Sequence, residues 1–118
     1  MLGGKCSDDD QALADIKNGK NMMDWFEGCI SVTCLGQCAA NCMKKHGFSE
    51  QCLPCFKKGA NCIKDKCAYH CSGADPLEIF GTCKGCIQEK CMPDFITCSG
   101  LSLPLSDKLV KKLINGFN

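Results

Sequence analysis

The residues in this chain that could do chemistry are its cysteines, which number 14 among 118 residues. An even number allows complete pairing, although the sequence alone does not select one of the many connectivities. We predict that all of them form disulfides, each contributing about 2–4 kcal/mol of stability, and that these bonds hold a fold with a modest apolar core. The cysteines are Cys6, Cys29, Cys34, Cys38, Cys42, Cys52, Cys55, Cys62, Cys67, Cys71, Cys83, Cys86, Cys91 and Cys98.

Two cysteine pairs have the C-x2-C spacing that zinc sites and redox-active dithiols share, namely Cys52 with Cys55 and Cys83 with Cys86. The segment Cys52-Leu53-Pro54-Cys55 resembles a thioredoxin-type motif, so a thiol–disulfide oxidoreductase is one alternative function. Zinc is disfavoured because Cys29 to Cys42, on one helix, would extend over about 20 Å of its axis. We therefore expect no metal and no cofactor.

Candidate general bases are few, because the chain has only two histidines. His46 precedes Gly47, His70 precedes Cys71, and no two cysteines are adjacent. The chain thus lacks the C-C-x-x-H-D-x-C segment and the glycine-rich calcium loop of secreted phospholipase A2, a family of similar length and disulfide number. We interpret both histidines as polar surface groups or helix C-terminal charges, and expect no catalytic residue. The chain is predicted not to be an enzyme.

The charged and polar residues argue against a nucleic-acid partner and against a membrane-spanning segment. All 14 basic residues are lysines and the formal net charge is +1, whereas nucleic-acid binding usually relies on arginine and a strong positive charge. The longest uncharged stretch, 28–43, is interrupted by polar residues and is too short to span a bilayer. We expect no nucleic-acid partner and no transmembrane segment.

The positions of the cysteines and of helix caps predict an all-α fold, since strand-forming residues are sparse and no segment alternates with period two. Cysteines 29, 34, 38 and 42 would share one face of a helix that ends near Gly47. A second helix would carry cysteines 62, 67 and 71. A third would begin at Asp75-Pro76 and continue towards Cys91, before Pro93.

An internal repeat emerges from the cysteine spacing, in which a C-x4-C-x3-C segment precedes a C-x2-C pair. The segments 29–55 and 62–86 both contain this pattern, and we favour a duplicated helical hairpin over coincidence. The chain is accordingly divided into an N-terminal arm, 1–27, a disulfide-rich helical domain, 28–100, and a linker with an amphipathic C-terminal helix, 101–118.

The two flanks contain the predicted partner contacts. Ser106-Asp107 caps the last helix, whose apolar stripe needs a surface to cover. Its own core, a partner protein and, last, a membrane surface are the alternatives, so peripheral membrane contact remains open. In the arm, aromatic side chains are the best anchors. The predicted partner-binding residues are Trp25, Phe26, Leu105, Leu109, Leu113 and Phe117.

One stretch has a family resemblance. Cys67-x3-Cys71, Phe80-x2-Cys83 and Cys91-Met92-Pro93 together resemble the cysteine-rich helical domain that precedes the lipocalin barrel of violaxanthin de-epoxidase, an enzyme of the thylakoid lumen. The carotenoid-binding barrel is absent from this chain, and Cys86 has no counterpart in that spacing. The resemblance implies a disulfide-rich helical module, without catalysis, in a plastid lumen.

We therefore expect a non-catalytic structural or binding protein, an accessory subunit of a larger assembly. It would act in an oxidising compartment, either secreted or in an organelle lumen such as the thylakoid lumen. The alternative class is a secreted effector, toxin-like or inhibitory, that presents loops on the disulfide scaffold.

The pairing of the cysteines has a direct test in the intact mass of the native protein. Seven disulfides should lower the mass by about 14 Da relative to the fully reduced chain, because each bond removes two hydrogens. A deficit near zero together with bound zinc would instead support metal coordination by free thiolates.

Overall fold

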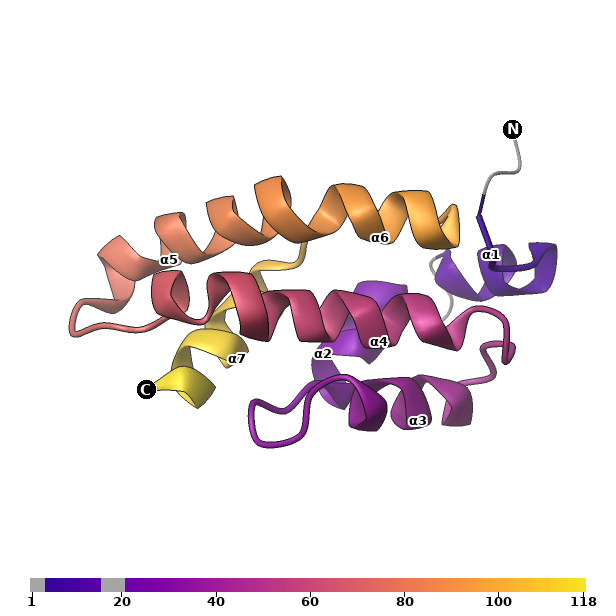
Figure 1. Cartoon of the computed structure of the whole chain (residues 1–118), viewed down its shortest axis with the longest axis horizontal. Helices are drawn as coiled ribbons and strands as arrows, with labels where there is room; N and C mark the ends of the chain where they lie inside the picture. Colours follow the sequence, from indigo (N-terminus) through magenta and orange to yellow (C-terminus); the bar gives the residue numbers. More distant parts are fainter. Residues whose placement is uncertain (1–3, 16–20) are drawn as a thin grey trace.

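Two long helical arms form an antiparallel hairpin, and shorter helices pack around it (Figure 1). The computed structural model describes residues 4–15 and 21–118, and all the regular secondary structure in that part of the chain is helical, which confirms the predicted disulfide-rich all-α class. The arms of the hairpin are α4 (Leu53–Cys62), η1 (Ile63–Cys67) and η2 (Tyr69–Cys71), then α5 (Pro76–Cys86), η3 (Ile87–Cys91) and α6 (Met92–Ser99). The shorter helices are α1 (Asp8–Ala14), α2 (Met22–Cys29), α3 (Gln37–Lys45) and α7 (Asp107–Phe117).

Four of these helices begin where the sequence supplies a capping side chain. Ser7 and Asn21 form capping boxes at the first turns of α1 and α2. The carboxylate of Asp75 accepts a hydrogen bond from the backbone N–H of Leu77, and the hydroxyl of Ser106 accepts one from Leu109, as the sequence predicted for α5 and α7. Capping thus determines where these helices start, independently of the disulfides.

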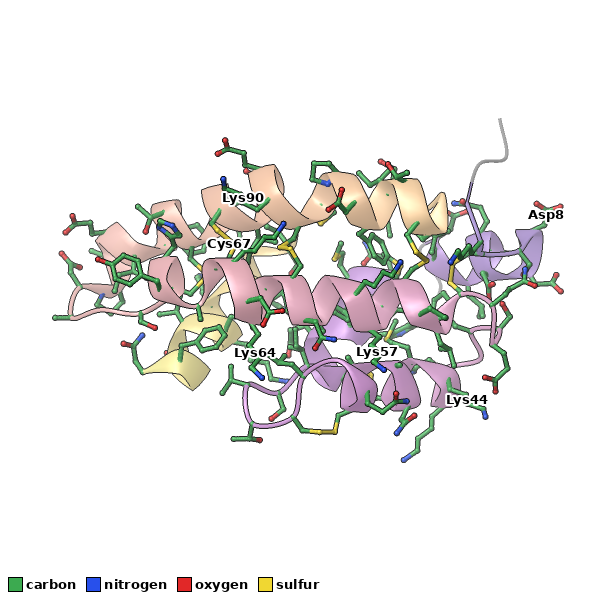
Figure 2. The ribbon with its side chains drawn as sticks, viewed as in Figure 1. Asp8, Lys44, Lys57, Lys64, Cys67 and Lys90 are labelled. Carbon is green, nitrogen blue, oxygen red and sulfur yellow. A yellow bond between two sulfur atoms is a disulfide. The ribbon has the colours of Figure 1, made fainter. Side chains whose placement is uncertain are left out.

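Four disulfides cross the hairpin as a ladder. Within each bond the residue numbers add up to 153, or to 154 for the bond nearest the turn, which is the register of two antiparallel segments. The labelled Cys67 in Figure 2 belongs to this ladder. The ladder consists of Cys55–Cys98, Cys62–Cys91, Cys67–Cys86 and Cys71–Cys83.

A π-helical turn in each arm keeps the cysteines on the facing sides. Cys62 and Cys67 are five residues apart, as are Cys86 and Cys91. In an α-helix five residues turn through about 500°, which leaves the second residue about 140° from the first. A π turn, with its i to i+5 hydrogen bonds, brings such residues close to alignment. The π turns η1 and η3 coincide with these two steps and contact each other across the hairpin.

The core lies between the hairpin and the shorter helices, and Phe56 is at its centre. This side chain is 1 % exposed, and its ring centroid is 5.9 Å from that of Phe26, 5.0 Å from Phe48 and 5.5 Å from Phe95. These four rings connect α2, α4, α6 and the segment after α3. The ladder and this aromatic cluster therefore act on the same group of helices.

The helix predicted through cysteines 29 to 42 is wrong in one respect, because the chain forms two helices there. Helix α2 ends at Cys29 and α3 begins at Gln37, with Gly36 at a φ of 73° between them. Only glycine adopts this conformation without strain. The end of α3 just before Gly47 agrees with the prediction.

Pro93 does not end the third predicted helix. It lies in the first turn of α6, directly after the π turn η3, where a backbone N–H has no intrahelical partner and proline is therefore tolerated. The second arm thus continues to Ser99, and this extension brings Cys98 opposite Cys55.

The two sets of cysteines that suggested a repeat form different bonds. In the first set Cys29 pairs with Cys42 and Cys34 with Cys38, whereas all three cysteines of the second set join the ladder. Duplication of the two segments therefore stays a prediction from spacing, which the bonding pattern does not repeat.

The N-terminal arm is fastened at the end of the hairpin opposite the turn. Cys6 is bonded to Cys52, and the backbone N–H of Lys5 donates to the carbonyl of Cys98 at 2.7 Å. Helix α7 lies at the other end, against α5 and α2 (Figure 1). None of the helices in the described ranges has both the length and the apolar character that spanning a membrane requires.

Truncation of the central ring should destabilise the protein strongly. We expect Phe56→Ala to lower the free energy of unfolding by about 3–5 kcal/mol, because it leaves a cavity among three other rings. Denaturant unfolding with the disulfides intact measures this. Leu77→Ala, at a position 89 % exposed, is the control and should change stability by less than about 0.5 kcal/mol; equal losses would contradict this description of the core.

Candidate functional site

The turn end of the hairpin exposes the two large apolar side chains that are most open to solvent in the described residues, Tyr69 at 87 % and Leu77 at 89 %. Tyr69 lies in η2 and Leu77 in the first turn of α5, on either side of the turn 72–75. We call Tyr69, Leu77 and the half-buried Phe80 the hairpin-end patch. Leu77 and Phe80 line one groove, and Tyr69 lines a separate hollow with Gly73 and Thr82. Large exposed apolar side chains on both sides of one turn are candidates for an interaction surface.

The backbone under this patch is held firmly. The Cys71–Cys83 bond closes the hairpin directly below the turn. Asn118, at the end of α7, accepts a hydrogen bond from the backbone N–H of Gly73 at 2.9 Å, and its amide donates to the carbonyl of Cys71. Gly73 has a φ of 148°, and a Cβ there would lie 2.7 Å from the side chain of Ile79. The turn is therefore rigid although its side chains are exposed.

A groove of about 460 Å³ runs beside the patch, between α5 and α7. Its charged side chains are of both signs, but Asp107 forms an ion pair with Lys84 at 2.9 Å, and the ammonium of Lys84 also lies 5.9 Å from the centre of the Phe80 ring. Lys111 has no ion-pair partner among the residues that the structure describes. The groove is lined by Pro76, Leu77, Phe80, Asp107, Lys111, Ile114 and Asn115.

Sequence reasoning missed this patch, although a signal was present. The buried residues of α5 are Ile79, Cys83 and Cys86, which repeat at the i, i+4, i+7 spacing of one helix face. Leu77 does not belong to that series, so the periodicity of the sequence contained a signal that this large apolar residue lies outside the core.

The predicted partner-binding residues lie mainly in the core of the chain itself. The expectation that the apolar stripe of the last helix contacts a partner is therefore corrected. Phe26, Leu105, Leu109 and Leu113 are each 8 % exposed or less. The stripe of α7 is covered by α5 and α2, the first of the alternatives considered above. Phe117 is half-buried and packs against the same core.

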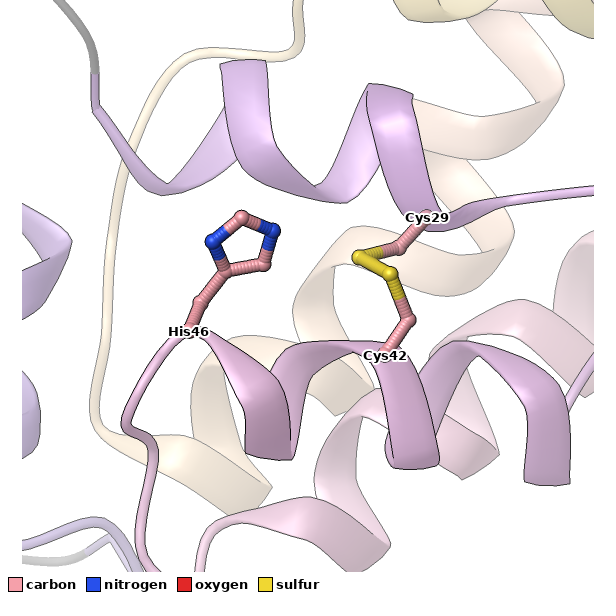
Figure 3. A group of neighbouring side chains, drawn as sticks. All are labelled: Cys29, Cys42 and His46. Carbon is pink, nitrogen blue, oxygen red and sulfur yellow. A yellow bond between two sulfur atoms is a disulfide. The ribbon is translucent and has the colours of Figure 1, made fainter.

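Trp25, the remaining predicted anchor, stacks on a histidine that lies next to a disulfide, rather than presenting an open face. Its ring is half-buried and stacks on that of His46, with centroids 5.4 Å apart and planes 3° from parallel. Figure 3 shows His46 on the same side of α3 as Cys42, which is bonded to Cys29 of α2. The sulfur atoms and an imidazole nitrogen lie within 4.8 Å of one another. Sulfur atoms in a disulfide are not thiolates, so in this state the trio offers a metal only the imidazole.

Neither C-x2-C pair forms an internal bond. Cys52 is bonded to Cys6 and Cys55 to Cys98, and Cys52 and Cys55 are both fully buried. The interpretation of 52–55 as a redox-active pair is therefore wrong. Cys83 and Cys86 likewise belong to two different bonds of the ladder. A thioredoxin-like reaction needs the two sulfurs of one motif to form and break a bond with each other, with one sulfur accessible. These four sulfurs act as cross-links instead.

Asp10 is a buried carboxylate that connects α1 to the segment before α4. The backbone N–H of Ser49 donates to one oxygen at 2.8 Å, and the hydroxyl of Ser49 and the backbone N–H of Ser7 donate to the other. Burial by itself raises the pKa of Asp10, but these hydrogen bonds outweigh burial and hold its pKa below the ordinary value. The carboxylate therefore has a structural role, beside the Cys6–Cys52 bond.

Comparisons of the chain with family models, curated proteins and solved structures found no match.

The Asp10 network should make stability depend on pH. Because folding lowers the pKa of Asp10, its stabilising contribution is present above the ordinary value of 3.8 and is lost as the pH falls through the lower folded value. We expect Asp10→Asn to cost about 1.5–3 kcal/mol at neutral pH, with a smaller difference from the unmodified chain at about pH 2. Denaturant unfolding at both pH values checks this. Exposed Asp8→Asn is the control, and an Asp10→Asn difference that is constant with pH would contradict the assignment.

Proposed function

We propose that this chain is a non-catalytic binding protein of an oxidising compartment and acts as an accessory subunit of a larger protein assembly. Seven intramolecular disulfides in a small helical protein fit such a compartment, because reducing compartments keep thiols free. The resemblance of 67–93 to the helical domain of violaxanthin de-epoxidase supports a plastid lumen as one such location.

The observation that carries this proposal is the hairpin-end patch on a rigid support. Exposing Leu77 and Tyr69 almost completely leaves apolar surface in water, and covering them with a partner recovers that free energy. The turn below them is fixed by Cys71–Cys83 and by Asn118, so binding costs little ordering of the backbone. A preorganised apolar patch of this kind supports recognition of another protein.

The groove beside the patch defines the chemistry of the partner. Leu77 and Phe80 favour an apolar side chain, and the ammonium of Lys111 favours a carboxylate next to it. We therefore propose a protein segment that presents an apolar residue with a neighbouring aspartate or glutamate. The interior cavity between α2, the hairpin and α7, at about 30 Å³ and with an apolar lining, is far smaller than a small-molecule site, so the proposal rests on the groove and the patch alone.

The test is the native size of the protein in the cells that produce it. The unmodified chain should elute in an assembly much larger than its own 12.8 kDa, and Leu77→Asp should elute as the free monomer, because a buried carboxylate there would be unpaired and would add a second negative charge beside that of the partner. Thr97→Asp, at an exposed position near the other end of the hairpin, is the matched control and should stay in the assembly.

Circular dichroism and the intact mass of each variant establish that the fold and disulfides are unchanged. An unmodified chain that elutes as a monomer would overturn the accessory-subunit proposal, and one that binds a receptor or a protease as a released monomer would support the secreted-effector alternative. A Leu77→Asp chain that stays in the assembly would show that another surface makes the contact.

A further inference from the structure

One of the seven disulfides, Cys34–Cys38, differs from the others in its access to solvent. Each of the other six includes at least one buried cysteine, whereas Cys34 is exposed and Cys38 is half-buried. A thiolate must reach one sulfur of a disulfide in order to break it, so exposure decides which bond reacts first. Cys34–Cys38 is therefore the disulfide in this chain that an external thiol meets most readily.

This bond also cross-links the least structure. It spans only four residues, from the loop after α2 to the first turn of α3, whereas the ladder bonds span 12 to 43 residues. In the chain-entropy model a disulfide that closes a short loop constrains the unfolded chain less than one that closes a long loop. Opening Cys34–Cys38 leaves the ladder, Cys6–Cys52 and Cys29–Cys42 intact, so the core survives its reduction.

The two sulfurs have different surroundings, which gives the reaction a direction. Cys38 is the second residue of the nine-residue helix α3, whose N-cap, Gly36, has no side chain to accept a hydrogen bond from the first turn. The free N–H groups and the positive end of the helix dipole stabilise a thiolate there and make Cys38 the better leaving group. Cys34, outside the helix and more exposed, is the sulfur that a nucleophile reaches.

The turn between them is held in place. Gly36 has a φ of 73°, and a Cβ there would overlap the side-chain amide of Asn61 in α4. The backbone between Cys34 and Cys38 is thus packed against the hairpin and keeps the two Cα atoms 5.7 Å apart, within the range of a disulfide. The pair can therefore close again after it has been opened.

We propose that Cys34–Cys38 is a thiol–disulfide exchange site that oxidises a dithiol. One thiolate of the dithiol attacks Sγ of Cys34, the Cys34–Cys38 bond breaks, and Cys38 leaves as a thiolate. The second thiol of the reductant, as its thiolate, then attacks the reductant's first sulfur, which is bonded to Cys34 in the mixed disulfide, and displaces the Cys34 thiolate. The products are an oxidised, cyclic disulfide of the reductant and two cysteine thiols in the protein, so two electrons pass from the dithiol to Cys34–Cys38.

The reductant must be a dithiol because the Cys38 thiolate displaces a monothiol from Cys34. After a monothiol has bonded to Cys34, the Cys38 thiolate lies four residues away and displaces it again at high effective concentration. Only a reductant with its own second thiol completes the reaction at a comparable rate. This activity goes beyond the proposed binding function and concerns a different part of the molecule from the hairpin-end patch.

The experiment treats the folded, fully oxidised protein with limiting dithiothreitol, quenches it with N-ethylmaleimide, and maps the alkylated residues by peptide mass spectrometry. Cys34 and Cys38 should be alkylated first, at least about tenfold faster than any other pair, with one dithiothreitol oxidised per chain and unchanged circular dichroism. Earlier alkylation of another pair, or alkylation of all pairs together with loss of helix, would overturn the proposal.

Reduced glutathione, used alone at the same thiol concentration, tests the direction and the need for a dithiol. It should give little net reduction, and the trapped mixed disulfide should be on Cys34. Glutathione on Cys38, or reduction as extensive as with dithiothreitol, would overturn the mechanism.

A double substitution, Cys34→Ser with Cys38→Ser, should remove the fast phase and leave the fold intact. The corresponding change at Cys29 and Cys42 is the matched control, and it should retain the fast phase. If only the control lost the fast phase, the fast reaction would belong to Cys29–Cys42, and the proposal would be overturned.

Discussion

The four disulfides that cross the hairpin from Cys55–Cys98 to Cys71–Cys83 constrain everything else in this structure. They hold the two arms antiparallel, and a π turn in each arm keeps successive cysteines on the side that faces the other arm. Since covalent bonds fix the relative position of the two hairpin arms, the remaining helices have a fixed surface on which to pack. Helix α3 packs on α4 and α7 on α5, and the N-terminal arm is bonded through Cys6 to Cys52. A chain with few large apolar residues can form a single core in this way.

The same constraint separates rigid from reactive parts of the surface. The ladder bond nearest the turn supports the hairpin-end patch, where Tyr69 and Leu77 remain exposed on a backbone that does not need to move. Cys34–Cys38, in contrast, contributes nothing to the ladder, and it can open without releasing any helix from the core. Binding and exchange would therefore operate at separate places without one disturbing the other.

Local signals in the sequence predicted much of the secondary structure. The caps at Asp75 and Ser106 were identified because a capping hydrogen bond involves only neighbouring residues. The break between α2 and α3 was missed, since cysteine spacing alone is compatible with one continuous face, whereas the break depends on the positive φ of Gly36. The continuation past Pro93 was missed because it depends on a π turn. The five-residue spacing of Cys86 and Cys91 indicates this turn only when the position of the opposing arm is known.

What the sequence by itself determined was the class of molecule: 14 cysteines, few strand formers and several helix caps are sufficient for a cross-linked helical protein. Only the tertiary structure decided which sulfurs meet, because pairing depends on distances between residues up to 46 positions apart. That decision buried Cys52 and Cys55 in separate bonds, placed the stripe of α7 inside the core and left Leu77 outside it. Periodicity states that a helix has an apolar face, but the element that covers the face is chosen by packing between distant segments.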